Sequence, residues 1–163
     1  MKRFIALYFL YLGFLFTFFV LQNTYVSQIL NTFQTNLTLI FLDFFLEENQ
    51  RMGRDIWIHS NYKIIITDTC NGIIPFLFLT ASLWAYPAKI LPKTLWTFFG
   101  YIILFLVNGL RILWVVYVTK NGEGQEDFYW SHDIVGNAFL MFFGLLLFVG
   151  FIKSTRRIAK NKV

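Results

Sequence analysis

The chain has few charged residues and almost no cysteine. Of its 163 residues, 14% are charged and 57% are hydrophobic, and the mean hydropathy is +0.58. So little polar surface cannot coat a water-soluble globule of this size. The single cysteine, Cys70, excludes an internal disulfide bond. The composition therefore predicts an integral membrane protein with one domain, residues 1–163.

Several common functional motifs are also missing. One cysteine and two histidines do not form a ligand spacing known from metal sites. No glycine motif of the kind that binds phosphate occurs. Aromatic residues make up 21% of the chain, but many lie inside apolar runs, where they would contact lipid or neighbouring helices. We therefore expect no metal, no nucleotide cofactor and no nucleic-acid partner, and we expect membrane lipid around the chain.

Four apolar runs are candidates for crossing the membrane. A span needs about 20 residues, and the runs cover approximately residues 4–21, 71–88, 95–118 and 134–152. The first run exceeds the length of a signal-peptide core and no cleavage site follows it, so we expect a retained anchor. The second run is short, and it reaches the required length only with the flanking residues included.

Basic residues predict the orientation of these runs. Lysine and arginine cluster at both ends of the chain and in the loop 87–93. Cytoplasmic segments are enriched in these residues. If all three clusters are cytoplasmic, the second and fourth runs begin at the outer face and the third run ends there. We expect a multi-pass protein of the cell membrane with both termini in the cytoplasm.

The region between the first two runs is more polar. In residues 26–48, apolar side chains recur at helical spacing among amides and hydroxyls, which predicts an interfacial helix on the outer surface or a fifth span. Residues 54–67 are rich in β-branched and aromatic side chains around a polar centre, which favours a hairpin of two short strands. The expected fold is an all-α integral membrane protein with about four transmembrane helices, this interfacial helix and this hairpin.

Three residues near the outer ends of the runs could carry out chemistry. Cys70 follows capping-type residues at a helix start, where the positive end of the helix dipole favours a thiolate. Arg111 interrupts an apolar run, which costs at least about 2.5 kcal/mol at mid-bilayer unless the arginine faces a polar cavity. His132 opens the last run, where the dipole favours the neutral imidazole. Together they suit nucleophilic attack, charge stabilisation and proton transfer.

Each of these residues also has an ordinary explanation. Cys70 could be a small buried hydrophobic side chain, Arg111 could extend to the outer headgroups, and His132 could be an exposed interfacial histidine.

Three further residues would support a reactive site by orienting the guanidinium or the imidazole, namely Asn108, Asp68 and Asp133. Asn108 lies one helical turn before Arg111 on the same face.

Three short blocks in this order resemble the exosortase/archaeosortase family, and the compact size resembles the exosortase F type. The blocks are Cys-Asn-Gly at 70–72, Asn-Gly-Leu-Arg at 108–111 and His-Asp at 132–133. The resemblance implies a membrane-embedded cysteine transpeptidase, in which Cys70 is the nucleophile and Arg111 and His132 are the essential arginine and histidine. It covers approximately residues 64–151. Longer family members have additional N-terminal spans.

The resemblance also implies the substrates. These are exported proteins that end in a short motif, a hydrophobic helix and a basic tail; cleavage near the outer end of that helix passes the acyl group to an acceptor amine or surface polymer. The alternative is a non-catalytic membrane scaffold in a system that exports surface proteins or polysaccharide. A transporter or channel subunit is less consistent with the sequence, because the polar membrane residues gather on one side.

Overall fold

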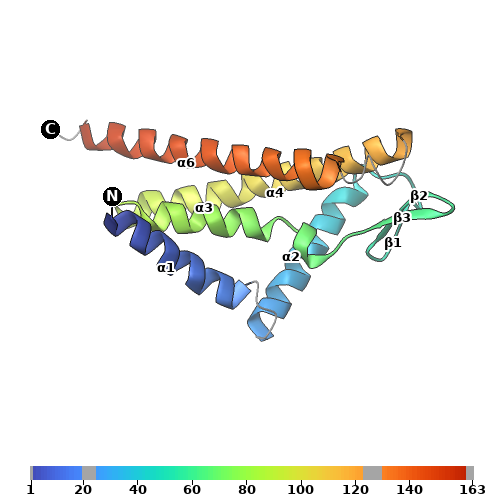
Figure 1. The fold of residues 1–163 in the computed structure, drawn as a ribbon, viewed down its shortest axis with the longest axis horizontal. Helices are drawn as coiled ribbons and strands as arrows, with labels where there is room; N and C mark the ends of the chain where they lie inside the picture. The colour runs from blue at the N-terminus through green and yellow to red at the C-terminus, as the bar shows by residue number, and fades with distance from the viewer. Residues whose placement is uncertain (1, 20–24, 123–129, 161–163) are drawn as a thin grey trace.

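The computed structural model describes residues 2–19, 25–122 and 130–160, and most of them are helical. Helices α3 (Ile73–Ala85), α4 (Ile90–Asn121) and α6 (Asn137–Lys160) pack against one another, and α1 (Lys2–Phe19) packs against α3. Helix α2 (Tyr25–Asp43) lies obliquely to them (Figure 1). Both termini and the α3–α4 connection lie at one end, and a small sheet lies at the other, which we call the sheet end.

Three helices of the described chain are long and apolar enough to cross a membrane. These are α1, α4 and the Asn137–Arg157 part of α6. Helix α3 has only 13 residues and is about 20 Å long, shorter than the roughly 30 Å hydrocarbon core. It ends at Ala85 because Tyr86, which precedes a proline, is extended with φ −71° and ψ 138°. The expected four spans are therefore not confirmed; the finding is three spans and a shorter apolar helix.

Helix α4 joins two separate hydrophobic cores. Its 32 residues correspond to about 48 Å, so it extends well beyond one hydrocarbon core. Near the sheet end its buried residues pack with α2 and the strands, in a cluster that includes Leu42, Ile56, Ile66, Ile112 and Val115. Further along, α3, α4 and α6 share a second cluster of Leu79, Leu83, Leu104, Leu147 and Phe151. The residues of α4 between these two cores include Asn108 and Arg111.

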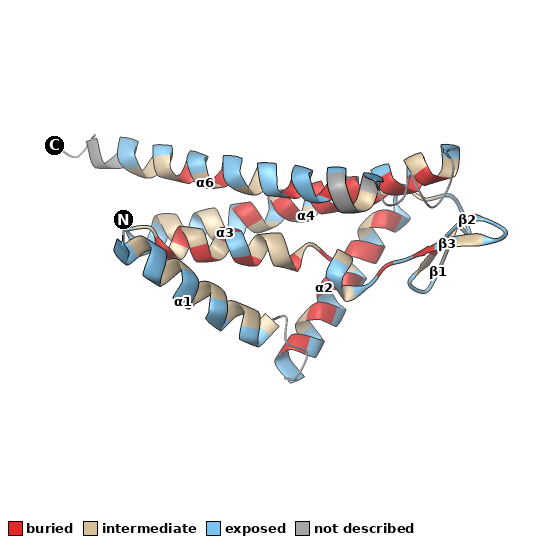
Figure 2. Ribbon diagram, viewed as in Figure 1, coloured by how far each residue is buried: buried red, intermediate tan, exposed pale blue. Residues whose placement is uncertain are grey.

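Helix α2 has a buried polar face and an exposed apolar face. Its buried residues are mostly polar (Figure 2): Ser27, Asn31, Gln34, Thr35 and Thr38, with Leu39 and Leu42. Its exposed apolar residues include Tyr25, Val26, Ile29, Phe33 and Ile40. This is the reverse of an amphipathic helix in water, and it suits a helix whose outer side contacts lipid and whose polar side chains find partners inside the protein.

Three short antiparallel strands form the sheet in the order β1-β2-β3. Strands β2 (Asp55–His59) and β3 (Tyr62–Ile65) make a hairpin within residues 54–67, and β1 (Arg51–Met52) adds a third strand that the sequence analysis did not predict. Alternate isoleucines of the hairpin are buried against α4. The chain then leaves β3 directly into a 3₁₀ turn, η1 (Asp68–Cys70).

Candidate active site

Cys70 lies at the end of the turn η1, and α3 begins three residues later at Ile73. The turn is closed by a backbone hydrogen bond from Cys70 N–H to Thr67 O of 2.9 Å. Gly72 then reverses the chain with a left-handed φ of +77°, a conformation that residues with a side chain rarely adopt. Cys70 therefore ends a separate 3₁₀ turn before α3, whereas the sequence analysis expected it at the start of the helix itself.

Asn108 fastens this loop to α4. Its Nδ2 donates a hydrogen bond of 2.8 Å to Cys70 O, and its side chain is fully buried. A Cβ atom at position 72 would lie 2.9 Å from Cγ of Asn108, so only glycine allows the loop this close an approach. Gly109 likewise allows α4 to approach α2 closely, since a Cβ atom at position 109 would lie 2.3 Å from the Phe41 ring. The Cys-Asn-Gly and Asn-Gly-Leu-Arg blocks thus pack against each other directly.

Arg111 is buried in the protein, with 6% of its surface exposed. Its guanidinium donates to His132 O at 3.0 Å, to Asn137 Oδ1 at 3.3 Å and to Asn108 Oδ1 at 3.4 Å. An arginine that extended to lipid headgroups would be exposed, so this explanation does not fit the structure. The guanidinium instead joins α4 to the segment that carries His132, and this segment is a π-helix, η2 (Trp130–Gly136), leading into α6.

His132 approaches the thiol. Its Nε2 lies 3.6 Å from Cys70 Sγ, which is hydrogen-bonding distance for sulfur. Thr67 Oγ1 lies 3.4 Å from the same sulfur. The structure thus brings together the thiol, the imidazole and, through Asn108 and the His132 carbonyl, the guanidinium. These residues are up to 62 positions apart in the chain.

The neighbours of the thiol also set its acidity. Burial raises the pKa of Cys70, but the hydrogen bonds from His132 and Thr67 lower it by more, so the pKa falls from 9.0 to about 7. A cysteine with such a pKa is substantially thiolate at neutral pH, and the thiolate is the nucleophilic form. The lowering of the pKa was expected from a helix dipole; the contacts that lower it are the His132 side chain and both the side chain and the backbone of Thr67.

The sequence analysis predicts that Asp68 orients the imidazole or the guanidinium, but its hydrogen-bond partners are other residues. Its Oδ1 accepts hydrogen bonds of 2.9 Å from Thr35 Oγ1 and from Arg54. These contacts join the turn η1 to α2 and to Arg54 beside the sheet, so Asp68 anchors the turn. The side chain of Asp133, the other predicted carboxylate, lies outside the described residues.

The polar face of α2 supports the same loop, and the sequence analysis missed this role. The buried Asn71 side chain donates to Asn31 Oδ1 at 3.1 Å and accepts from the N–H of Ile73 at 3.0 Å, which caps α3. Gln34 donates to Asn71 O at 3.1 Å and accepts from Tyr101 at 2.7 Å. The signal was the recurrence of polar residues at helical spacing along α2, which marks one polar face.

Two cavities meet at Arg111. One, of about 410 Å³, lies beside the cysteine loop and is lined by Thr69, Gly72 and Asn137 as well as by Arg111. The other, of about 420 Å³, lies between α4 and the start of α6 next to Trp114. Among the described residues, no group of three His, Cys, Asp or Glu side chains is placed to hold a metal ion. The site offers a nucleophile, a proton acceptor and a buried cation beside a cavity.

Comparison with known proteins identifies a family for this chain. A family model described as transmembrane exosortase matches residues 2–149, a range that includes α1, α2 and all three sequence blocks. No curated protein and no solved structure shows a significant match. At the level of the family, this match indicates a membrane transpeptidase of the cysteine type. The chain belongs to the transmembrane exosortase family.

Proposed function

We propose that this protein cleaves the C-terminal sorting signals of exported proteins through a thioester on Cys70 and transfers the acyl group to an amine, on a surface polymer or another acceptor. The observation that carries the proposal is the 3.6 Å contact between Cys70 Sγ and His132 Nε2, next to the buried Arg111. The substrates are those of the family: exported proteins with a short motif, a hydrophobic helix and a basic tail.

Each residue has one role in the proposed reaction. The Cys70 thiolate attacks the carbonyl carbon of the scissile peptide bond, and Arg111 stabilises the negative charge that develops on the carbonyl oxygen. His132, which takes the thiol proton, returns it to the leaving nitrogen as the carbon–nitrogen bond breaks. An acceptor amine, or water, then attacks the thioester, the carbon–sulfur bond breaks, and the thiolate is restored.

Two further residues position these groups. Asn108 holds the Cys70 carbonyl with its amide N–H and accepts from Arg111 with its amide oxygen. Asn108 therefore connects the loop that carries Cys70 to the guanidinium of Arg111. Asp68 holds the turn η1 from the opposite side through Thr35 and Arg54. Both residues are positioning residues in this proposal.

The charge distribution supports an extracytoplasmic site with both termini in the cytoplasm. At the sheet end, four basic side chains each pair with a carboxylate: Arg51–Asp43, Arg54–Asp68, Lys63–Asp55 and Lys120–Glu47. The basic clusters near the termini and in the α3–α4 connection lie at the other end (Figure 1). Cytoplasmic ends are the ones enriched in lysine and arginine, so the sheet end and Cys70 face outward.

The test is a cleavage assay in cells. The chain is co-expressed with an exported protein from the same genome that ends in a polar motif, an apolar helix and a basic tail. We expect the precursor to lose its C-terminal segment, and we expect hydroxylamine to release the new C-terminus from Cys70 as a hydroxamate, because hydroxylamine cleaves thioesters. Mass spectrometry identifies both products. A precursor that stays intact at normal expression of both proteins contradicts the proposal.

The acidity of Cys70 gives a second test. Because the thiolate forms as the pH rises through about 7, the rate of alkylation by iodoacetamide should rise with a midpoint near that pH. Replacing His132 by asparagine removes one lowering contact, so the midpoint should move up and the rate at pH 7 should fall about tenfold or more. The alkylation rate is measured by quenching the reaction at a series of times, and Cys70 is the single cysteine that can be labelled.

The matched control for that experiment is His59→Asn, since His59 is the other histidine of the chain and lies exposed in β2. We expect this variant to keep the midpoint of the unmodified protein. An unchanged midpoint in His132→Asn would show that the imidazole does not act on the sulfur.

A further inference from the structure

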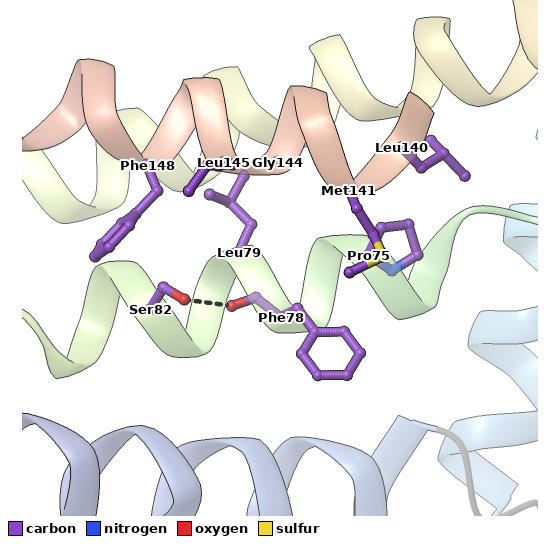
Figure 3. Close-up of a pocket in the computed structure, with 9 residues that line it drawn as sticks. All are labelled: Pro75, Phe78, Leu79, Ser82, Leu140, Met141, Gly144, Leu145 and Phe148. Carbon is purple, nitrogen blue, oxygen red and sulfur yellow. Dashed lines mark hydrogen bonds between the residues drawn. The ribbon is translucent and has the colours of Figure 1, made fainter. Parts of the chain in front are cut away.

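A groove between α3 and α6 continues from the active site along the helices. The cavity beside the cysteine loop, of about 410 Å³, and a second cavity of about 400 Å³ share four lining residues: Pro75, Phe78, Leu140 and Met141. The second cavity extends past Gly144 to Ser82 and Phe148 (Figure 3). We call the two cavities together the α3/α6 groove. It leads from Arg111 and Gly72 away from the sheet end.

The groove changes in polarity along its length. Near the active site its lining includes Thr69, Arg111 and Asn137. Beyond Pro75 the lining is apolar apart from Ser82, whose hydroxyl donates 2.9 Å to the Phe78 carbonyl within the same helix. A ligand that fits must therefore be polar beside the cysteine loop and apolar in the part of the groove beyond Pro75.

The groove opens sideways to the lipid. Met141 and Leu145, which line it, are 74% and 60% exposed. At its far end, the Phe148 ring lies 6.2 Å from that of Phe4 and 6.4 Å from that of Tyr86. This cluster joins the start of α1 and the end of α3 to the middle of α6. The ligand therefore enters from the membrane and does not pass along a closed channel.

From these features we infer that the α3/α6 groove binds the apolar helix of the substrate, directly after the peptide bond that is presented to Cys70. The inference rests on the proposed function, because it assumes a peptide at the thiol. A peptide in a groove open to lipid must satisfy its own backbone hydrogen bonds, which a helix does and an extended chain does not. Asn137 to Phe148 corresponds to about 16 Å, so the groove holds about the outer half of a spanning helix.

Gly144 makes the inference testable. It is half-buried, yet a Cβ atom at this position would meet no other atom within 4 Å, because the position faces the groove. Gly13 in α1 is equally open but lies outside the groove. In reconstituted vesicles we expect Gly144→Trp to reduce cleavage about 100-fold, because a helix displaced by about 1 Å misplaces the scissile carbonyl. Gly13→Trp should cleave at the normal rate.

Alkylation of Cys70 in Gly144→Trp, at the unmodified rate, shows that the site is folded. If this variant is folded and cleaves normally while the unmodified chain is active, the groove assignment is wrong and the proposed function stands. A Gly144→Trp variant that alkylates slowly is replaced by Gly144→Leu, for which the same two outcomes apply.

Crosslinking tests the occupant without catalysis. In a Cys70→Ala background, Leu145→Cys is paired with a single cysteine placed in the second helical turn of the substrate. We expect an oxidative disulfide crosslink that Leu10→Cys, on the exposed face of α1, does not give. Equal crosslinking at both positions, or crosslinking of Leu145→Cys to a second copy of the chain, overturns the inference. A crosslink at Leu145→Cys alone supports docking even if no cleavage is ever found, in which case only the proposed function fails.

Discussion

Replacing Cys70 by alanine is expected to abolish cleavage of a co-expressed sorting-signal protein, with a loss of at least about 10⁴-fold. Removal of the nucleophile of a catalytic unit has effects of this size, since the remaining groups stabilise charge but form no covalent intermediate. Cys70→Ser should be similarly inactive, because a serine hydroxyl is far less acidic than a thiol whose pKa is about 7. The measurement is the ratio of cleaved product to precursor by immunoblot and mass spectrometry.

The control for the Cys70 variants is the amount and position of the protein in the membrane, together with crosslinking to the substrate through Leu145→Cys. Both should be unchanged, because Cys70 is held through its backbone carbonyl by Asn108, and alanine keeps that carbonyl. Unaltered cleavage in Cys70→Ala would remove the nucleophile assignment. If Arg111→Ala then abolished surface export while Cys70→Ala did not, a scaffold would be the better description.

Replacing Arg111 by lysine is expected to reduce cleavage about 10²- to 10³-fold, the range found when one donor to a developing oxyanion is removed. Lysine keeps the positive charge but has no planar fork. It therefore cannot reproduce the three hydrogen bonds to His132, Asn137 and Asn108. The maximal rate of cleavage should fall more than the apparent affinity for substrate.

Alkylation of Cys70 separates the two possible roles of Arg111, because iodoacetamide reacts without forming an oxyanion. If Arg111→Lys lowers cleavage but leaves alkylation unchanged, Arg111 acts on the reacting carbonyl. If both rates fall together, the arginine only holds the His132 segment in place. The matched control is Arg51→Lys, an arginine paired with Asp43 at the sheet end, which should cleave at the normal rate.

The proximity of Cys70, Arg111 and His132 could be anticipated from the sequence. Consecutive membrane helices alternate in direction, so the basic clusters at one end imply that the ends carrying these residues lie together. An arginine in an apolar run also implies a polar surrounding, and its three oxygen acceptors are such a surrounding. The catalytic roles of the three residues remain predictions until the variants above are measured.

The role of α2 could not be anticipated, although residues 26–48 were expected to be helical and α2 covers Tyr25–Asp43. Periodicity identifies two faces but does not say which one is buried. In water the apolar face is inside, whereas in lipid the polar face is inside. The partners of this face include Asp68, which was expected to orient the guanidinium or the imidazole, and Asn71, which was noted only as part of the Cys-Asn-Gly block. Their contacts with Thr35 and Asn31 required the tertiary structure.

Short and irregular elements were missed for a different reason. Strand β1 has two residues, too few for any alternation to be read. The π-helix η2 has an ordinary helical sequence, and its His132 carbonyl accepts from Arg111, 21 residues earlier. Helix α3 is shorter than the expected run of residues 71–88, because a continuous apolar run does not reveal that the chain becomes extended before Pro87.

The inverted polarity of α2 has a consequence for how the chain is made. Asp68 and Tyr101, whose side chains bond Thr35 and Gln34 of α2, lie 33 and 67 residues further along, so the ribosome delivers α2 well before them. Until those later segments are synthesised, some polar side chains of α2 lack hydrogen-bond partners, which is unfavourable in the hydrocarbon core of the membrane. Stable packing of α2 therefore requires that the cysteine loop and α4 have been synthesised. A truncated chain would expose the polar face of α2, which membrane quality control can recognise.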